Sequence, residues 1–224
     1  MRYVVVAVLA GATALFFSTY DPYAPDGPEL LVNGDFRAGL LGWEFSTGVE
    51  GRASVAHDAL VLTSHDPRRI VYLRQRVGDL LHHRLLRLSG WLRASGVRRG
   101  VHYWNTARLL LVPTDSAGKP AHGAYHVLSS LQGTSDWRHV QEVILIPPDT
   151  VSVELIAELH RAVGSFWVRD LRLQPVKETP GFSRARKVAT LVWVIVGLWV
   201  MAPYLDIRRW SARHWTLALS VLVV

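Results

Sequence analysis

Residues 31–36 of this chain read LVNGDF, and residues 164–173 read GSFWVRDLRL. Between them, from about Glu29 to Pro175, short runs of β-branched and apolar residues alternate with turn signals. Such spacing is typical of a sandwich made of many short strands. The region shows no helical period, internal repeat or low-complexity tract. We therefore expect an all-β domain over residues 29–175.

The pattern predicts strands at Leu30–Asn33, Ala59–Thr63, Ile70–Val77, Leu85–Ala94, Ala107–Pro113, Ala124–Ser130, Trp137–Ile146, Val151–Leu159 and Ser165–Leu173. Turns are predicted where Gly, Pro, Asp and Ser gather. These places are Asp66-Pro67, Ser95-Gly96, Asp115-Ser116-Ala117-Gly118, Gly133-Thr134 and Pro147-Pro148-Asp149.

The two framing segments resemble the opening and closing strands of carbohydrate-binding modules of the galactose-binding-like jelly-roll type, such as those of families 4, 9 and 22. Residues 87–94, RLSGWLRA, are similar to the strand that often carries a Ser-x-Trp-x-Arg pattern in these modules. DWR at residues 136–138 is similar to the tryptophan that opens a late strand. The resemblance implies a jelly-roll β-sandwich whose first and last strands are adjacent, and it implies carbohydrate binding.

Alternation along the strands predicts an outer face that is rich in aromatic and arginine side chains. The residues expected there are Tyr72, Arg74, Arg76, Trp91 and Arg93, because their neighbours along each strand are apolar. If their strands share one sheet with residues 151–159, the face suits a sugar: a flat ring stacks on its C–H side and arginines bind its oxygens. The alternative is a solvated face on which arginines pair with Glu154 and Glu158.

A loop after Gly100 offers a second candidate for the ligand site. Tyr103, Trp104 and Asn105 follow this turn and are predicted to form an aromatic platform on the loop. Trp43, Trp137 and Trp167 are interpreted as structural, because they lie in motifs that build the sandwich.

The family resemblance also implies a structural calcium ion between the first and last strands. Asp170 matches one acidic position of that site, but Arg169 stands where the family has a second acidic residue. Arg37 follows Phe36 where such modules often have Glu. Calcium needs several oxygen ligands. Asp170 is the one ligand that the sequence predicts for it, and no other cofactor is expected.

Residues 1–20 are predicted to form a transmembrane signal anchor, since the run Tyr3–Phe17 carries no charge. A cleaved signal peptide is the alternative, although bulky side chains occupy the region of the cleavage site. A second transmembrane helix is predicted at residues 188–205, with linkers at residues 21–28 and 176–187. Residues 206–214 are predicted to form a basic cytoplasmic loop. Residues 215–224 are interpreted as the start of a further membrane segment, which predicts that the chain is a fragment.

Positive residues favour the cytoplasmic side of a membrane. Arg2 and the loop at residues 206–214 are therefore predicted to lie in the cytoplasm of a bacterium, so that each end of the chain is cytoplasmic or embedded in the membrane. The β-domain is then expected on the outer, periplasmic side of the inner membrane. Arg184, Arg186 and Lys187 oppose this orientation.

The formal charge of +7 and the pI of about 10.1 favour anionic partners, namely lipid head groups and acidic glycans. Nucleic acid is not expected outside the cytoplasm. The sequence has no cysteine, phosphate-binding glycine loop or hydrolase motif, so an enzyme is not expected. We predict a membrane-anchored module that binds an acidic cell-surface glycan. The alternative is an accessory subunit or docking domain of a larger membrane protein complex.

Overall fold

The computed structural model describes residues 2–46, 51–78, 80, 83–121 and 125–202. Its internal contacts divide the chain into two compact units. One unit is Pro25–Lys177, and the other combines Met1–Ala24 with Glu178–Val224.

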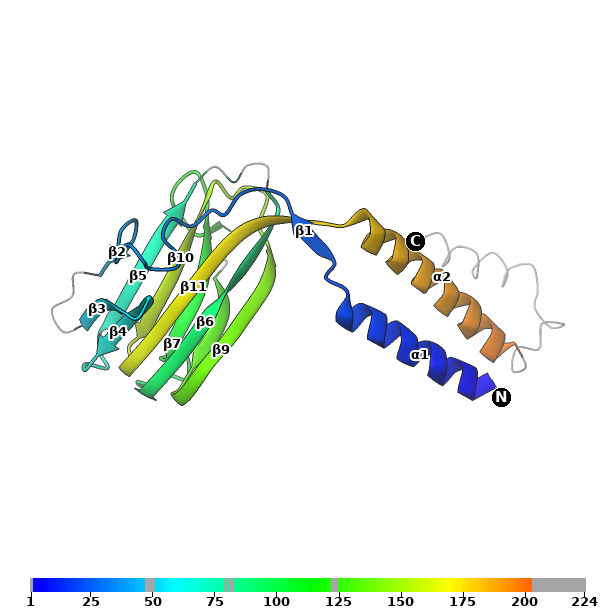
Figure 1. The fold of residues 1–224 in the computed structure, drawn as a ribbon, viewed down its shortest axis with the longest axis horizontal. Helices are drawn as coiled ribbons and strands as arrows, with labels where there is room; N and C mark the ends of the chain where they lie inside the picture. The colour runs from blue at the N-terminus through cyan, green and yellow to red at the C-terminus, as the bar shows by residue number, and fades with distance from the viewer. Residues whose placement is uncertain (1, 47–50, 79, 81–82, 122–124, 203–224) are drawn as a thin grey trace. The chain divides into compact units, whose positions relative to one another are not determined.

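The unit Pro25–Lys177 is a sandwich of two antiparallel β-sheets (Figure 1). The first sheet has the order β3 (Gly51–Ala56), β4 (Ala59–Ser64), β11 (Val163–Glu178), β6 (Leu85–Arg98) and β9 (Gly133–Leu145). The second sheet has the order β2 (Glu44–Phe45), β5 (Ile70–Val77), β10 (Ser152–His160), β7 (Ala107–Thr114) and β8 (His126–Leu131). A short strand, β1 (Tyr23–Pro25), precedes the sandwich in sequence. The arrangement is consistent with the predicted jelly-roll.

The core lies between the sheets and takes alternate residues from each strand, because successive side chains of a strand point to opposite faces. Leu86, Leu88 and Leu92 of β6 are fully buried, as are Leu109 and Leu111 of β7. Burial of each such side chain contributes about 1.5–3 kcal/mol. The inward faces predicted from alternation are therefore confirmed.

The segment predicted as the first strand, Leu30–Asn33, is not a strand. It does lie beside the middle of β11, because Leu30 N donates to Leu173 O at 2.9 Å and Leu171 N donates to Gly34 O at 2.9 Å. The chain then turns away, since Asn33 and Phe36 have positive φ values of 54° and 57°. Such values are incompatible with extended backbone.

Other strand boundaries also differ from the prediction. The turn predicted at Ser95-Gly96 is an irregularity within β6, where the register shifts and Gly96 has a φ of 60°. Gly in a strand marks either a turn or a bulge, and here it marks the bulge. Strands β2 and β3 were not predicted at all. Of the predicted strand Ala124–Ser130, residue 124 lies outside the described residues, and β8 begins at His126.

The other unit contains helices α1 (Arg2–Thr19) and α2 (Pro180–Met201). Thr179 caps α2, because its hydroxyl oxygen accepts a hydrogen bond from Phe182 N at 3.4 Å. Pro180 occupies the first turn, where its missing N–H leaves no helical hydrogen bond unmade. Residues 180–187, predicted as part of a linker, therefore begin this helix.

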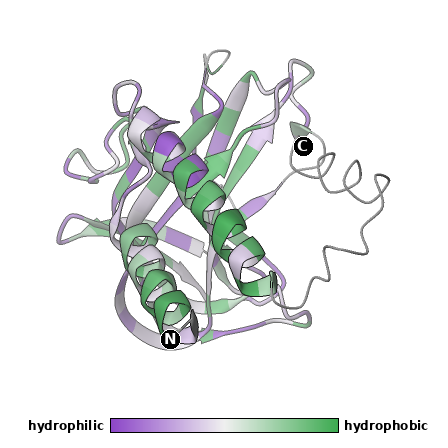
Figure 2. Ribbon diagram, turned by 90° about the vertical axis from the view of Figure 1, so that its right-hand side faces the viewer, coloured by the Kyte–Doolittle hydropathy of each residue, from purple (hydrophilic) through white to green (hydrophobic). Residues whose placement is uncertain are grey.

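Both helices carry apolar side chains along most of their length (Figure 2). They contact one another, since the ring of Phe182 meets that of Phe17 edge-on at 5.4 Å. Across the ranges that the structure describes, neither helix combines the length and hydropathy needed to traverse a bilayer, so the predicted spans at residues 1–20 and 188–205 are not supported. The predicted basic loop and final apolar stretch, residues 206–224, lie outside the described residues.

Candidate functional site

The predicted ligand residues fall in three separate places. Tyr72, Arg74 and Arg76 lie on the outer face of the second sheet, because β5 belongs to it. Trp91 and Arg93 lie on the outer face of the first sheet, on β6. The prediction that these strands share one sheet with β10 is therefore wrong for β6, and the five side chains do not form one face.

On the second sheet the charges are paired with one another. Arg74 Nη2 lies 2.9 Å from Glu44 Oε2, and Arg74 Nη1 lies 3.6 Å from Glu154 Oε2. The hydrogen bond to Glu44 raises the pKa of Arg74, which also lies over the Tyr72 ring at 5.9 Å. Arg76 Nε donates to Ser152 Oγ at 3.1 Å. These contacts match the alternative of a face with cross-strand ion pairs.

Glu158, on β10 of the same sheet, is also paired with an arginine and is more deeply buried. It is 6% exposed, and its carboxylate accepts two hydrogen bonds from the guanidinium group of Arg108, directly across from it on β7. His160 Nδ1 lies 3.3 Å from the same oxygen, Glu158 Oε1. A carboxylate engaged in this way holds neighbouring strands together and has little capacity left for a ligand.

The outer face of the first sheet carries a cluster of tryptophans and arginines. The guanidinium carbon of Arg169 lies 4.3 Å from the ring centre of Trp137 and 5.7 Å from that of Trp91. Arg93 lies 5.2 Å from the ring centre of Trp167. All three rings are half-buried. The arginines thus occupy positions over the rings where a sugar would stack, as expected for cation–π pairs.

Trp137 and Trp167 belong to this outer face and are absent from the hydrophobic core, so their interpretation as sandwich-building residues needs refinement. Trp43, in contrast, lies in the core, 5.3 Å from the ring of Phe36. The tryptophan cluster was missed because its members come from three strands that are far apart in sequence. Only the register, in which Arg169 lies opposite Trp91 and Trp167 lies opposite Arg93, brings them together.

The loop between β6 and β7, residues 99–106, presents the predicted aromatic platform. Tyr103 is 76% exposed and Trp104 is 43% exposed. Their rings are nearly perpendicular, at 82° and 4.7 Å, and the imidazole of His102 stacks on Trp104 at 4.4 Å with an angle of 9°. His102 therefore supports the ring plane of Trp104 while both aromatic side chains remain open to solvent.

Asn105 does not share this exposure, because it is only 1% exposed. Its Oδ1 accepts a hydrogen bond from His102 N at 2.8 Å, and its backbone N donates to His102 O at 3.0 Å. Asn105 thereby closes the loop that holds the two aromatic residues. Its Nδ2, although buried, has no hydrogen-bond partner among the described residues.

A cavity of about 350 Å³ adjoins the platform. It is lined by Pro67, Arg68, Val101, His102, Asn105 and Arg161. We call it the loop cavity.

Hydrogen bonds join the opening segment to β11 in the region where the calcium ion was predicted. Glu29 Oε1 accepts from Leu31 N at 3.1 Å and from Leu173 N at 2.6 Å, and so ties the opening segment to β11. Asp170 has a φ of 51°, and its Oδ2 lies 3.9 Å from Arg169 Nε. Within the described ranges, no group of three or more acidic, histidine or cysteine side chains has an arrangement that could hold a metal ion.

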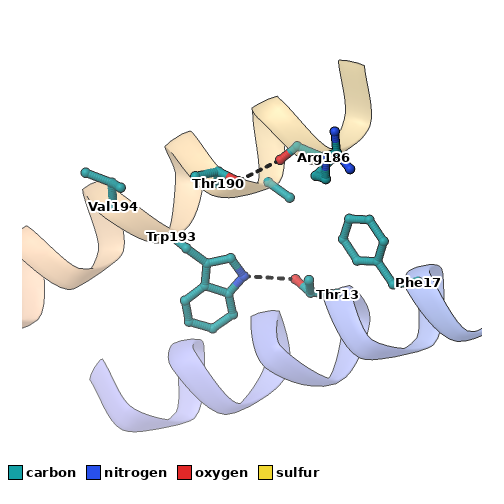
Figure 3. A pocket seen from close by; sticks show the side chains of 7 residues that line it. Thr13, Phe17, Arg186, Thr190, Trp193 and Val194 are labelled. Carbon is teal, nitrogen blue, oxygen red and sulfur yellow. Dashed lines mark hydrogen bonds between the residues drawn. The ribbon is translucent and has the colours of Figure 1, made fainter. Parts of the chain in front are cut away.

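A groove of about 470 Å³ lies between α1 and α2 (Figure 3). Its lining is apolar apart from Arg186 and two threonines, and Trp193 Nε1 donates to Thr13 Oγ1 across it at 3.3 Å. Arg186 is itself paired, with its Nη1 3.3 Å from Glu178 Oε1. The groove joins the helices and offers no further polar group to a ligand.

Solved structures share the sandwich. The enzymatically active domain of bacteriophage CBA120 tailspike protein 4 matches with a TM-score of 0.51 and 16% identity, over 65% of this chain and 21% of that one. This chain thus corresponds to about a fifth of the tailspike domain. A CBM4 structure has a TM-score of 0.47 and 15% identity, over 64% of this chain and 98% of that one. The CBM22-1 xylan-binding domain from Paenibacillus barcinonensis Xyn10C has a TM-score of 0.46 and 17% identity, over 70% of this chain and 99% of that one.

At these identities the likeness concerns the fold alone. The unit Pro25–Lys177 shares a β-sandwich fold with the tailspike domain. No protein-family model matches the sequence, and a search of curated proteins gave no match.

Proposed function

We propose that this chain is a non-catalytic glycan-binding module that takes its ligand at the loop platform of Tyr103 and Trp104. The observation that carries the proposal is the exposure of two fixed aromatic rings on a loop that is closed by a buried asparagine. Aromatic rings of this kind stack against the apolar C–H face of a sugar ring. A platform that is already ordered loses little conformational entropy on binding.

The outer faces of the two sheets are weaker candidates for the ligand site, and ligand contacts there remain proposals. On the second sheet, Arg74 is already paired with Glu44 and Glu154. On the first sheet, Arg169 lies over Trp91 and Trp137. A sugar would have to displace these internal contacts, whereas the platform is open.

Membrane association is the second part of the proposal. Large apolar side chains of both helices are exposed, among them Val4, Val8, Leu191 and Ile195. Exposed apolar surface of this extent is stabilised by lipid or by a protein partner. We place the sandwich on the outer side of a bacterial inner membrane, in line with the charge distribution of the sequence. Flotation of the chain with lipid vesicles would support this part, and its recovery as a lipid-free monomer would refute it.

A glycan array tests the ligand directly, with the whole 224-residue chain in mild detergent. Trp104→Ala should weaken binding about tenfold, since an aromatic contact contributes roughly 0.5–1.5 kcal/mol beyond its burial. Tyr125→Ala is the matched control, because Tyr125 is 63% exposed and lies outside the platform loop. Equal binding by wild type and Trp104→Ala would refute the platform. Absence of any glycan binding would leave docking onto a membrane-complex partner as the better function.

A further inference from the structure

The loop cavity is formed where three connections of the sandwich meet. Arg68 comes from the β4–β5 turn, Asn105 from the β6–β7 loop, and Arg161 from the β10–β11 turn. Backbone hydrogen bonds hold the connections together, from Arg161 N to Arg69 O at 3.0 Å and from His160 N to Thr106 O at 2.9 Å. The walls of the cavity therefore come from three connections that hydrogen bonds hold together, and not from one loop.

The charge in this cavity is positive and uncompensated. Across the described ranges, neither Arg68 nor Arg161 has a carboxylate within ion-pair distance. The nearby carboxylate of Asp66 is engaged elsewhere, because its Oδ1 accepts from Arg68 backbone N at 2.8 Å and its Oδ2 lies 3.9 Å from Arg69 Nε. Two guanidinium groups are therefore available to an anion.

Asn105, one of the residues that line the cavity, carries a buried amide donor. Asn105 Oδ1 accepts from His102 N, which fixes the orientation of the amide and leaves Nδ2 as the group without a partner. A buried donor without an acceptor is unfavourable, because it has lost its hydrogen bond to water without gaining another. An acceptor oxygen in the cavity would remove this cost.

We infer that the loop cavity binds an acid group of the glycan, a carboxylate or a sulfate ester, through Asn105 Nδ2, Arg68 and Arg161. Planar guanidinium groups match the oxygens of such anions, and charge-assisted hydrogen bonds are the stronger kind. This inference rests on the proposed function, because the stack of His102 on Trp104 links the cavity to the aromatic platform. The platform would hold the sugar ring, and the cavity would select acidic sugars.

The amide of Asn105 gives a direct readout. The sequence contains two asparagines, Asn33 and Asn105, so two asparagine side-chain signals are expected in an amide NMR spectrum. Asn33 Nδ2 already donates to Gly39 O at 2.9 Å and is the internal reference. The full chain would be titrated with sodium glucuronate, with its methyl ester, and with sodium sulfate. Glucuronate should shift the Asn105 signal while the ester, which lacks the charge, should not.

Binding of a tetragalacturonate and of its methyl ester would then be compared in four proteins: wild type, Arg68→Met, Arg161→Met and the control Arg52→Met. Arg52 is an exposed arginine on β3, so its variant removes the same net charge at another place. Each cavity variant should bind the acidic form about tenfold more weakly than the control does. Sulfate should shift the Asn105 signal if the cavity accepts either kind of acid group.

The outcomes separate this inference from the proposed function. Equal binding of the acid and the ester, with the effect of Trp104→Ala retained, would overturn the acid cavity and leave the platform. An Asn105 signal that shifts with glucuronate in a chain that binds no oligosaccharide would overturn the platform and retain the cavity. An unshifted Asn105 signal, together with equal binding by Arg161→Met and Arg52→Met, would overturn the cavity.

Discussion

Replacing Gly34 by alanine tests how the opening segment is attached to the sandwich. A Cβ atom at this position would lie 2.2 Å from Leu171 O, a backbone atom that cannot move aside as a side chain would. The clash falls beside the hydrogen bond from Leu171 N to Gly34 O. Overpacking costs about 1–3 kcal/mol. Loss of the hydrogen bond adds roughly 0.5–1.5 kcal/mol, so we expect a loss of about 2–4 kcal/mol in the free energy of unfolding.

Thermal and urea denaturation of the whole chain, followed by near-UV circular dichroism, would measure this loss. For a domain near 150 residues, each kcal/mol lowers Tm by about 2–4 °C, so the expected shift is about 5–15 °C. Gly78→Ala is the matched control, because a Cβ at Gly78 meets nothing within 4 Å and its φ is not positive. If Gly34→Ala and Gly78→Ala unfold at the same temperature, the docking of residues 31–36 against β11 is wrong.

Two further predictions concern the sheets. Glu158→Ala should lower the free energy of unfolding by about 3–5 kcal/mol, because it leaves the guanidinium group of Arg108 buried without its partner. Glu44→Gln, in the exposed pair with Arg74, should lower it by about 1 kcal/mol or less. Urea denaturation measures both losses, and equal losses would contradict the conclusion that the Glu158–Arg108 pair is buried and the Glu44–Arg74 pair is exposed. Trp91→Ala, on the outer face, should cost less than Leu92→Ala, its fully buried neighbour, for which we expect about 2–5 kcal/mol. A larger loss for Trp91→Ala in the same assay would show that Trp91 is a core residue.

Alternation of side chains predicted the inward face of β6. The neighbours of Trp91 and Arg93 along this strand are apolar, and Leu92, which lies between them, is fully buried, because a strand has only two faces and apolar side chains favour the one away from water. The same pattern does not say which strands share a sheet. Trp91 and Tyr72 were placed together on that account, and they lie on different sheets.

The loop residues show a second limit. Tyr103 and Trp104 were predicted to be exposed and are, whereas Asn105 was placed with them and is buried. Its role depends on a hydrogen bond to the backbone of His102, three residues earlier, which no composition or spacing reveals. Arg68 and Arg161 carried no signal in the sequence, since their proximity arises only where three connections converge.

Net charge alone therefore does not identify the binding arginines of this chain. Three arginines on the sheets have partners within the fold: Arg74 has two glutamates, Arg108 has Glu158, and Arg169 has two tryptophan rings. Such groups gain little from an external anion, because binding it would break contacts that already stabilise the charge. Arg68 and Arg161 lack this compensation and lie beside an unpaired amide. Since an uncompensated charge gains most from an anionic ligand, the loop cavity is the place at which the proposed binding of an acid group should be tested.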